Sequence, residues 1–336
     1  MLYALDNYPQ ISESYIAAEI DYAIRAGVEV EVWRRRAPSN PGPVRVPLHE
    51  GRFEQAMARV RPDVVHFHWL KTAVRRADAV AKAGLSLTVR GHWHFDRDHI
   101  DFVSNHPAVH AAYMYPHALR RLENPSARLK PLPVSYNSAW YRCAEKKDPT
   151  RVVRTSAGKR VKDLALFIRV ASRLPDFHFV LVVARMNQRT QCVPELVALN
   201  REMGDPVELR INVEPEQVPE IVSPAGIYLH TYDLVTPFGM PVSIAEAMAT
   251  GSFLLVPDRE GAQEYIGDAG QLYRNEDEAV ERILATRDWS EEDWAAARIR
   301  SAERAVHHFA DHEVLPALLA DWCEIKRRRD PAFDGL

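Results

Sequence analysis

Short apolar runs alternate with longer segments of mixed polarity along the first half of the chain. A helical stretch from Tyr15 to Arg25 follows the first run, and Gly27 ends it. The strand-like segments are "LYAL" at 2–5, "VEVEVW" at 28–33, "RPDVVHFHWL" at 61–70 and "LSLTVRGHWH" at 85–94. Strand, loop and helix in this order predict parallel βαβ units and a doubly wound sheet.

The pattern restarts after a polar, proline-marked segment, "RCAEKKDPTR" at 142–151, which is typical of a linker between domains. One helix is expected from about Glu278 to Thr286, and others are expected from about Glu291 to Lys326. The strands expected between linker and helices are "RVVRTSA", "FHFVLVVA", "VELRIN", "GIYLHT" and "SFLLVP". The second half therefore predicts a second open α/β sheet, and ligands of such sheets bind beyond the carboxyl ends of the strands.

Composition narrows the class of protein. Of 336 residues, 46% are hydrophobic and 26% charged, which suits a globular chain of two domains. The net charge of −3 gives no overall attraction to nucleic acid or anionic lipid. The three cysteines indicate neither a disulfide framework nor a zinc site, and no signal peptide or membrane-length apolar run occurs. We therefore expect a cytoplasmic protein, with a membrane-peripheral location left open.

One loop and helix carry the clearest chemistry. In "YDLVTPFGMPVSIAEAMATG" a glycine-bearing turn with Gly239 leads into a helix that Gly251 ends. Backbone N–H groups at a helix start attract phosphate or sugar oxygens. Glu246 lies on the first turns of that helix, where a carboxylate can accept hydrogen bonds from a ribose diol. The sequence thus predicts a nucleotide site here.

Motifs in the same order along nearly the entire chain resemble the GT-B glycosyltransferases of the large retaining family four, the group 1 glycosyl transferases. They are "YPQISESYIAAEI", "RPDVVHFHW", "VRGHWHFD", "GKRVKDLALFIRVASRLP", "EAMATG" and "REGAQEYIGDAGQLY". The resemblance implies an α/β GT-B fold with two Rossmann-like domains facing across a cleft. The acceptor-side domain would span 1–142 and the nucleotide-sugar domain 150–310. The helix at 311–330 would cross back to the first domain.

The resemblance also implies an activity and a site. The protein would be an enzyme that moves a hexose or pentose, with retention, from a nucleotide-diphosphate sugar to a hydroxyl acceptor. Lys162 fits best as the cation that stabilises the leaving diphosphate, with Arg160 or Lys159 beside it. No cofactor or metal would then be required. The residues expected at the donor are Phe238, Gly239, Met240, Pro241, Glu246, Lys159 and Glu264, and those expected in catalysis are Lys162, Arg160, His92 and Arg90.

The sequence departs from the family pattern in three places. The first acid of the family's acidic pair is missing, because Phe238, or Thr236 on a longer-loop alignment, stands where it is expected. Arg90 replaces the histidine of the family's "HG" loop, although His92 and His94 follow at once. The segment "VVARMN" lacks the glycine usual after its strand. These departures leave the identity of the donor open.

Histidines and one loop allow more than one interpretation. His66 and His68 are two apart, as are His92 and His94, so each pair can point to one side of a strand. Donor or acceptor contacts by His92 or His94, capped strand ends and a zinc cluster are the alternatives. Ser12 and Glu13, like His94, are candidates for an acceptor or phosphate loop, or for a simple helix cap.

Several functions compete. The acceptor can be a sugar, a lipid-linked sugar or a small molecule. The arginines at 34–36 make an anionic acceptor conceivable, including a modified DNA base in a phage-type system. A GT-B epimerase is disfavoured, since it would need carboxylates near the sugar. A non-catalytic protein that only binds a sugar nucleotide is the third alternative, and the missing acid is its best support.

Overall fold

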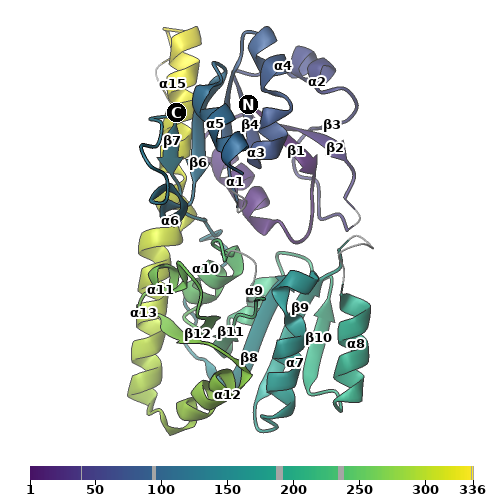
Figure 1. The fold of residues 1–336 in the computed structure, drawn as a ribbon, viewed down its shortest axis with the longest axis vertical. Helices are drawn as coiled ribbons and strands as arrows, with labels where there is room; N and C mark the ends of the chain where they lie inside the picture. The colour runs from purple at the N-terminus through teal and green to yellow at the C-terminus, as the bar shows by residue number, and fades with distance from the viewer. Residues whose placement is uncertain (39, 93–95, 187–191, 234–237, 334, 336) are drawn as a thin grey trace. The chain divides into compact units, whose positions relative to one another are not determined.

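The computed structural model describes residues 1–38, 40–92, 96–186, 192–233, 238–333 and 335. These residues form two compact units. The first unit comprises Met1–Gln10, Tyr15–Ser135 and Asp311–Leu336, and the second comprises Ile11–Ser14 and Tyr136–Ala310. Figure 1 shows that each unit is built on its own open sheet covered by helices.

The first unit contains a parallel seven-stranded sheet of order β3-β2-β1-β4-β5-β6-β7. Its strands are β1 (Leu2–Asn7), β2 (Glu31–Arg36), β3 (Leu48–His49), β4 (Val64–His68), β5 (Ser86–Arg90), β6 (Val109–Met114) and β7 (Leu129–Pro131). The order reverses direction between β1 and β4, as in a doubly wound sheet. The predicted architecture of this half is confirmed.

Helices cover both faces of this sheet. They are α1 (Ser14–Arg25), α2 (Phe53–Val60), α3 (Leu70–Val74), α4 (Ala77–Lys82), α5 (Arg97–Asn105), α6 (Pro116–Leu119), α14 (Asp311–Val314) and α15 (Pro316–Arg329). Successive strand residues alternate between two cores: Leu2 joins the core under α2 to α5, whereas Tyr3 joins the core under α1 and α15. His66 and His68 are two and four residues after Val64, so their side chains lie on the same face of the sheet as that of Val64. They therefore face α1 and α15.

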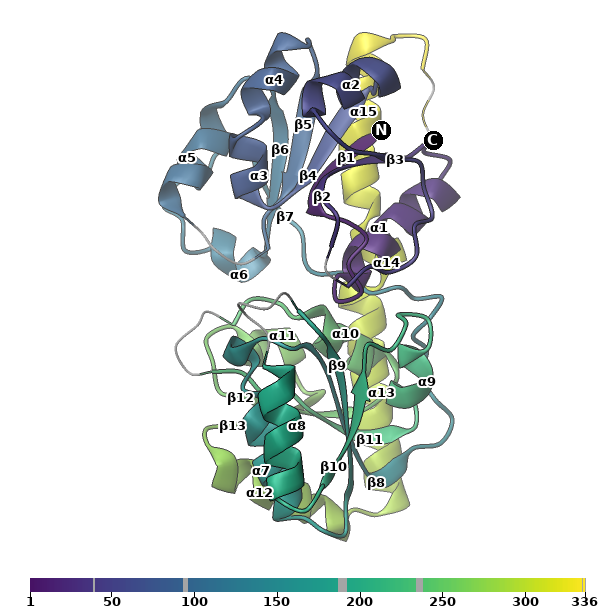
Figure 2. The ribbon, with the colours of Figure 1, turned by 90° about the vertical axis from the view of Figure 1, so that its right-hand side faces the viewer.

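The C-terminal helix α15 is part of the first unit (Figure 2). Leu318 and Trp322 belong to its core, and Trp322 Nε1 donates a hydrogen bond of 3.0 Å to Thr88 Oγ1 of β5. Asp321 accepts a 2.6 Å hydrogen bond from the Tyr113 hydroxyl. Hydrogen bonds from neighbours, Lys130 among them, lower the pKa of Asp321 to about 2 in spite of its burial. Both apolar packing and polar contacts therefore fix α15 on the sheet.

The second unit contains a parallel six-stranded sheet of order β10-β9-β8-β11-β12-β13. Its strands are β8 (Asp148–Ala157), β9 (His178–Ala184), β10 (Val207–Ile211), β11 (Ala225–Leu229), β12 (Phe253–Pro257) and β13 (Gly270–Tyr273). Its helices are η1 (Arg160–Lys162), α7 (Leu164–Ser172), α8 (Val193–Glu202), α9 (Val218–Val222), α10 (Val242–Ala249), α11 (Ala262–Ile266), α12 (Glu276–Ala285), η2 (Thr286–Asp288) and α13 (Glu291–Phe309). The prediction of a second open α/β sheet is confirmed.

One segment differs from the sequence pattern. The last residues of the expected linker are strand, since β8 starts at Asp148, whose N–H donates to the Pro224 carbonyl at 2.7 Å. This difference reflects a tertiary contact that a local pattern does not contain. The helices expected from Glu291 to Lys326 are three, because α13 ends at Phe309, α14 follows and Pro316 begins α15.

Candidate active site

The carboxylate predicted to bind nucleotide lies on α10 in the second unit. Gly239, in the turn before α10, has a φ of 65°, a left-handed conformation that favours glycine. Glu246 is 6% exposed. Its Oε1 accepts a 3.1 Å hydrogen bond from Ser14 Oγ, a residue of the same unit, and Tyr141 also hydrogen-bonds to it. Burial outweighs these bonds and raises the pKa of Glu246 to about 7.

This shift predicts a pH-dependent stability. The folded protein holds the Glu246 proton between the ordinary pKa of 4.5 and about 7, whereas the unfolded chain has lost it. The stabilisation is therefore present below pH 4.5 and is lost as the pH rises through 7. We expect Glu246→Gln to raise the melting temperature by several degrees at pH 8 and hardly at all at pH 5. Glu281→Gln, at an exposed position of α12, is the control. An equal shift at both pH values would contradict the raised pKa.

The other predicted donor residues surround the start of α10 and α11. Phe238 is buried and packs edge-on against the ring of His230 at 5.6 Å. Met240 is also buried, and the Pro241 carbonyl accepts a 2.8 Å hydrogen bond from the Tyr265 hydroxyl. Glu264 is exposed on α11. Thr236, the other position considered for the missing acid, lies outside the described residues.

The three cations of the basic loop after β8 lie in different environments. Lys159 precedes η1, and Arg160 is exposed and forms an ion pair of 2.5 Å with Glu195 of α8. Lys162 is half-buried instead, and its Nζ lies 4.5 Å from the centre of the Tyr232 ring. Burial, together with the positive charges of Arg154 and Lys159, lowers the pKa of Lys162 to about 7. Of the three, Lys162 is the cation held inside the unit.

Two buried residues that the sequence reasoning did not single out lie beside Lys162. Arg154, on β8, is 1% exposed and donates to the Thr231 carbonyl at 3.1 Å and to the Tyr228 hydroxyl at 2.7 Å. It also reaches Ser243 Oγ, on the first turn of α10, at 3.4 Å. Thr231 in turn donates from Oγ1 to the Lys162 carbonyl at 2.9 Å. These contacts join the basic loop to the start of α10.

His230 completes this cluster. It is fully buried, neither ring nitrogen has a hydrogen-bond partner among the described residues, and it stacks on Tyr232. Burial and the charges of Arg154 and Lys162 hold its pKa well below the ordinary value of 6.5. The sequence signal for both missed residues is a polar side chain within or just after an apolar strand, "RVVRTSA" and "GIYLHT". The second unit thus concentrates cationic groups where the carboxyl ends of β8 and β11 meet α10.

The remaining predicted catalytic residues belong to the first unit. Arg90 is 1% exposed, forms an ion pair with Glu19 of α1 and donates to the Pro133 carbonyl at 2.6 Å. His92 follows β5 and is 8% exposed. His94 lies outside the described residues. Arg90 and His92 are therefore both buried in the first unit.

Ser12 and Glu13 cluster with the second unit. Ser12 Oγ lies 3.7 Å from the sulfur of Met186, just after β9. Neither residue belongs to α1, which begins at Ser14. The predicted contact of Ser12 and Glu13 with the acceptor or with phosphate stays a proposal.

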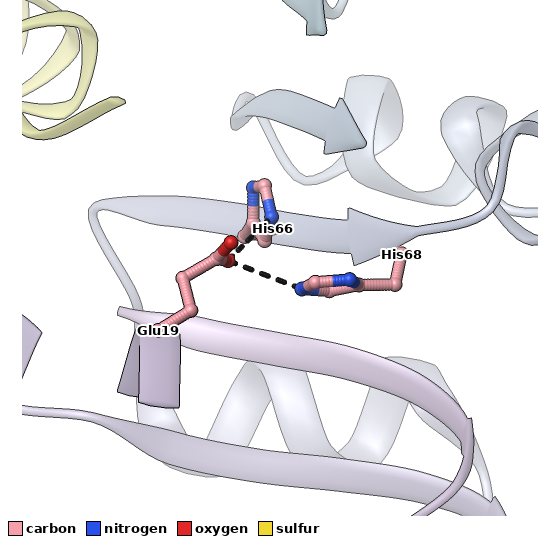
Figure 3. A group of neighbouring side chains, drawn as sticks. All are labelled: Glu19, His66 and His68. Carbon is pink, nitrogen blue, oxygen red and sulfur yellow. Dashed lines mark hydrogen bonds and ion pairs between the residues drawn. The ribbon is translucent and has the colours of Figure 1, made fainter. Parts of the chain in front are cut away.

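Three buried side chains offer possible metal-ligand atoms that lie close to one another. Glu19, His66 and His68 offer atoms that all lie within 4.8 Å of one another (Figure 3). In Figure 3 the two rings, from β4, converge on the carboxylate from α1. However, Arg90 pairs with the same carboxylate and balances its charge. The group therefore needs no cation for neutrality, and we assign it no metal.

Comparison with known proteins agrees with this arrangement. Residues 154–315, which carry the basic loop, β11 and α10, match the profile of the family described as glycosyl transferase-like. The whole chain has the fold of solved GT-B enzymes. The profile covers slightly less than half of the chain, and the likeness over the whole chain is one of fold. A search of curated proteins found no significant match.

Solved structures similar to this protein include HepE from Anabaena in complex with UDP and glucose, with 16% identity, a TM-score of 0.75 and coverage of 94% of this chain and 97% of that one. Sucrose-phosphate synthase from Thermosynechococcus elongatus has 15% identity, a TM-score of 0.74 and coverage of 99% and 100%. Trehalose 6-phosphate synthase from Burkholderia multivorans has 10% identity, a TM-score of 0.71 and coverage of 98% and 99%. The expected GT-B fold is confirmed.

Helix length and hydropathy bear on one further point. Among the described residues of this protein, every helix is too short or too polar to cross a lipid bilayer.

Proposed function

We propose that this protein is a glycosyltransferase that moves a sugar, with retention of anomeric configuration, from a nucleotide-diphosphate donor to a hydroxyl acceptor. The observation that carries the proposal is the placement of Lys162. Its amine lies over the Tyr232 ring, and its backbone carbonyl is joined through Thr231 and Arg154 to Ser243 on the first turn of α10, the helix that carries Glu246. The structures of HepE with UDP and with UDP-glucose support a nucleotide-sugar donor.

The chemistry follows from these side chains. When the glycosidic bond to the donor breaks, negative charge develops on the leaving diphosphate. A preorganised cation in a site of low dielectric stabilises that charge more than it stabilises the ground state. Lys162 would take up a proton as the diphosphate arrives, because an anion within contact raises the pKa of a neighbouring amine. We propose that this cation, rather than a bound metal, balances the leaving group.

The acceptor is proposed to be an uncharged hydroxyl compound. Two of the three arginines that suggested an anionic acceptor are engaged in local contacts. Arg34 pairs with Glu50 and donates to the Tyr8 carbonyl at 2.8 Å, and Arg35 pairs with Asp6 at 2.8 Å. These contacts leave less positive charge for a polymer such as DNA.

A panel of nucleotide sugars tests the proposal. We expect the purified protein to hydrolyse one donor slowly in water and to transfer its sugar faster when hydroxyl acceptors are added. Nuclear magnetic resonance of the product should show the anomeric configuration of the donor. Inversion would overturn the retaining assignment, and nucleotide-sugar binding without hydrolysis or transfer would favour the non-catalytic alternative.

Glu246 provides a separate test of the nucleotide site. If Glu246 binds the ribose, Glu246→Ala should weaken nucleotide binding by about 1.5–3 kcal/mol, the range for a hydrogen bond to a charged group. Isothermal titration calorimetry measures the change. Glu220→Ala, at an exposed position of α9, is the matched control and should bind as the wild type does. Equal affinity of the Glu246→Ala variant and the wild type would remove the ribose assignment.

A further inference from the structure

Glu19, His68 and His92 form a chain of hydrogen bonds in the first unit that the proposed function has not used. Glu19 is fully buried, and its Oε1 accepts from the Tyr3 hydroxyl at 3.1 Å and lies 3.1 Å from His68 Nε2. His68 Nδ1 lies 2.8 Å from His92 Nε2. The chain therefore runs from a carboxylate on α1, through a ring at the end of β4, to a ring just after β5.

The protonation states along this chain are determined by its carboxylate. The positive charge of Arg90 and hydrogen bonds from His66 and His68 hold the pKa of Glu19 well below its ordinary value in spite of burial, so Glu19 only accepts. His68 Nε2 must then carry a hydrogen and donate it. Burial lowers the pKa of His68 to about 4, so its ring is neutral and Nδ1 has a lone pair. His92 Nε2 must therefore donate to His68.

The geometry of the last bond supports this assignment. The rings of His68 and His92 are inclined by only 10°, and their centres are 5.0 Å apart. With 2.8 Å between the bonded nitrogens, that separation places the two rings nearly end to end in one plane. An N–H in the plane of its ring then points along the lone pair of the other ring, which is the favoured direction.

The remaining nitrogen of His92 is left as an acceptor. With hydrogen on Nε2 and a neutral ring, Nδ1 carries a lone pair. It has no hydrogen-bond partner among the described residues, and His92 is buried, with 8% of the residue exposed. The rings of Tyr15 and Trp69 lie 4.9 Å and 5.5 Å from that of His92 and hold it in place. His92 thus presents one acceptor of fixed direction between two aromatic side chains.

We propose that Glu19 and His68 lock His92 in the Nε2–H tautomer, so that His92 Nδ1 accepts a hydrogen bond from a hydroxyl group of the sugar-containing substrates. The contact with substrate rests on the proposed function. Glu19 and His68 are positioning residues, and His92 touches the substrate. Because burial and neighbouring charges hold the pKa of His92 well below 6.5, the ring is a poor base and orients a hydroxyl without removing its proton.

The tautomer can be measured without any substrate. Nitrogen-15 nuclear magnetic resonance of the full-length protein distinguishes a protonated from an unprotonated ring nitrogen. We expect His92 to be neutral from pH 5 to 8 with hydrogen on Nε2. In His68→Asn the amide can either donate to or accept from His92, so its signals should show both tautomers. Hydrogen on Nδ1 of His92 in the wild type would overturn the proposal, and so would an unchanged tautomer in His68→Asn.

Two substitutions of His92 test the contact with substrate. Asparagine can place its side-chain oxygen where Nδ1 lies, whereas glutamine reaches the position of Nε2. We expect His92→Gln to lower kcat/KM by about tenfold, the scale of one lost hydrogen bond between uncharged groups, and His92→Asn to keep most of the activity. His178→Phe, at an exposed histidine of the second unit, should match the wild type.

Equal activity of the His92→Asn and His92→Gln variants would overturn the contact with substrate. Circular dichroism and melting temperatures show whether each variant is folded. A wild-type protein that neither hydrolyses nor transfers any nucleotide sugar would overturn the proposed function. The tautomer measurement would then still decide whether the chain of hydrogen bonds from Glu19 through His68 fixes the tautomer of His92. The two failures are therefore distinguishable.

Discussion

Replacing Lys162 with alanine should lower the turnover number by on the order of a hundredfold or more, the scale for removing one preorganised group that stabilises developing charge. The physical reason is its burial beside Tyr232, which excludes water and strengthens the attraction between the amine and the leaving diphosphate. Steady-state kinetics with the preferred donor measure the change. A raised Michaelis constant with wild-type turnover would instead assign Lys162 to uniform binding of substrate and transition state.

Arg160 supplies the control for this experiment. It belongs to the same basic loop and carries the same charge, but its side chain is exposed and pairs with Glu195 of α8. Because an exposed ion pair contributes little, Arg160→Ala should leave both turnover and stability close to those of the wild type. A loss as large as that of Lys162→Ala would show that the whole loop, rather than the buried amine, acts on the leaving group.

Removing the indole of Trp322 should destabilise the first unit by about 3–5 kcal/mol, the range for truncating a large buried aromatic side chain. Trp322 is 3% exposed, packs edge-on against Tyr3 at 6.0 Å and donates to Thr88. Trp322→Ala therefore leaves both a cavity and an unmade hydrogen bond. Urea unfolding followed by circular dichroism measures the loss.

An exposed arginine of the same helix provides the comparison. Arg327→Ala changes a solvent-facing side chain of α15 and should alter stability by less than about 0.5 kcal/mol. A chain truncated after residue 310 lacks α14 and α15 altogether, so its first unit should not fold. If the truncated chain kept its fold and activity, the packing of α15 would contribute nothing essential.

The sheets were predictable because their strands are buried on both faces and stand out as apolar runs. "FHFVLVVA" predicts 177–184, and β9 spans His178–Ala184. Helix ends were less predictable. The break between α13 and α15 depends on Pro316 and on the contacts of Asp311, which pairs with Arg25 at 2.9 Å far away in the sequence. A local pattern cannot contain such a partner.

The residues of the candidate site that belong to a sequence motif were predictable, and those placed by tertiary contacts were not. Lys162 and Glu246 came from motifs. Arg154 did not, because the strand "RVVRTSA" has two arginines and nothing in its alternation tells which one is buried. Arg154 is 1% exposed because β8 is a central strand between β9 and β11. Apart from the neighbouring Thr155 carbonyl, its acceptors among the described residues belong to Tyr228, Thr231 and Ser243, more than seventy positions further along the chain.

The packing of α15 has a consequence for synthesis of the chain. The core of the first unit includes Leu315, Leu318 and Trp322, which follow the whole of the second unit in the sequence. The second unit, apart from Ile11–Ser14, is the continuous segment Tyr136–Ala310. Domains usually fold in the order in which they emerge from the ribosome. Here the order is reversed: the second unit has been made before α15, and the first unit must wait for α15 to complete the core that this helix shares with α1.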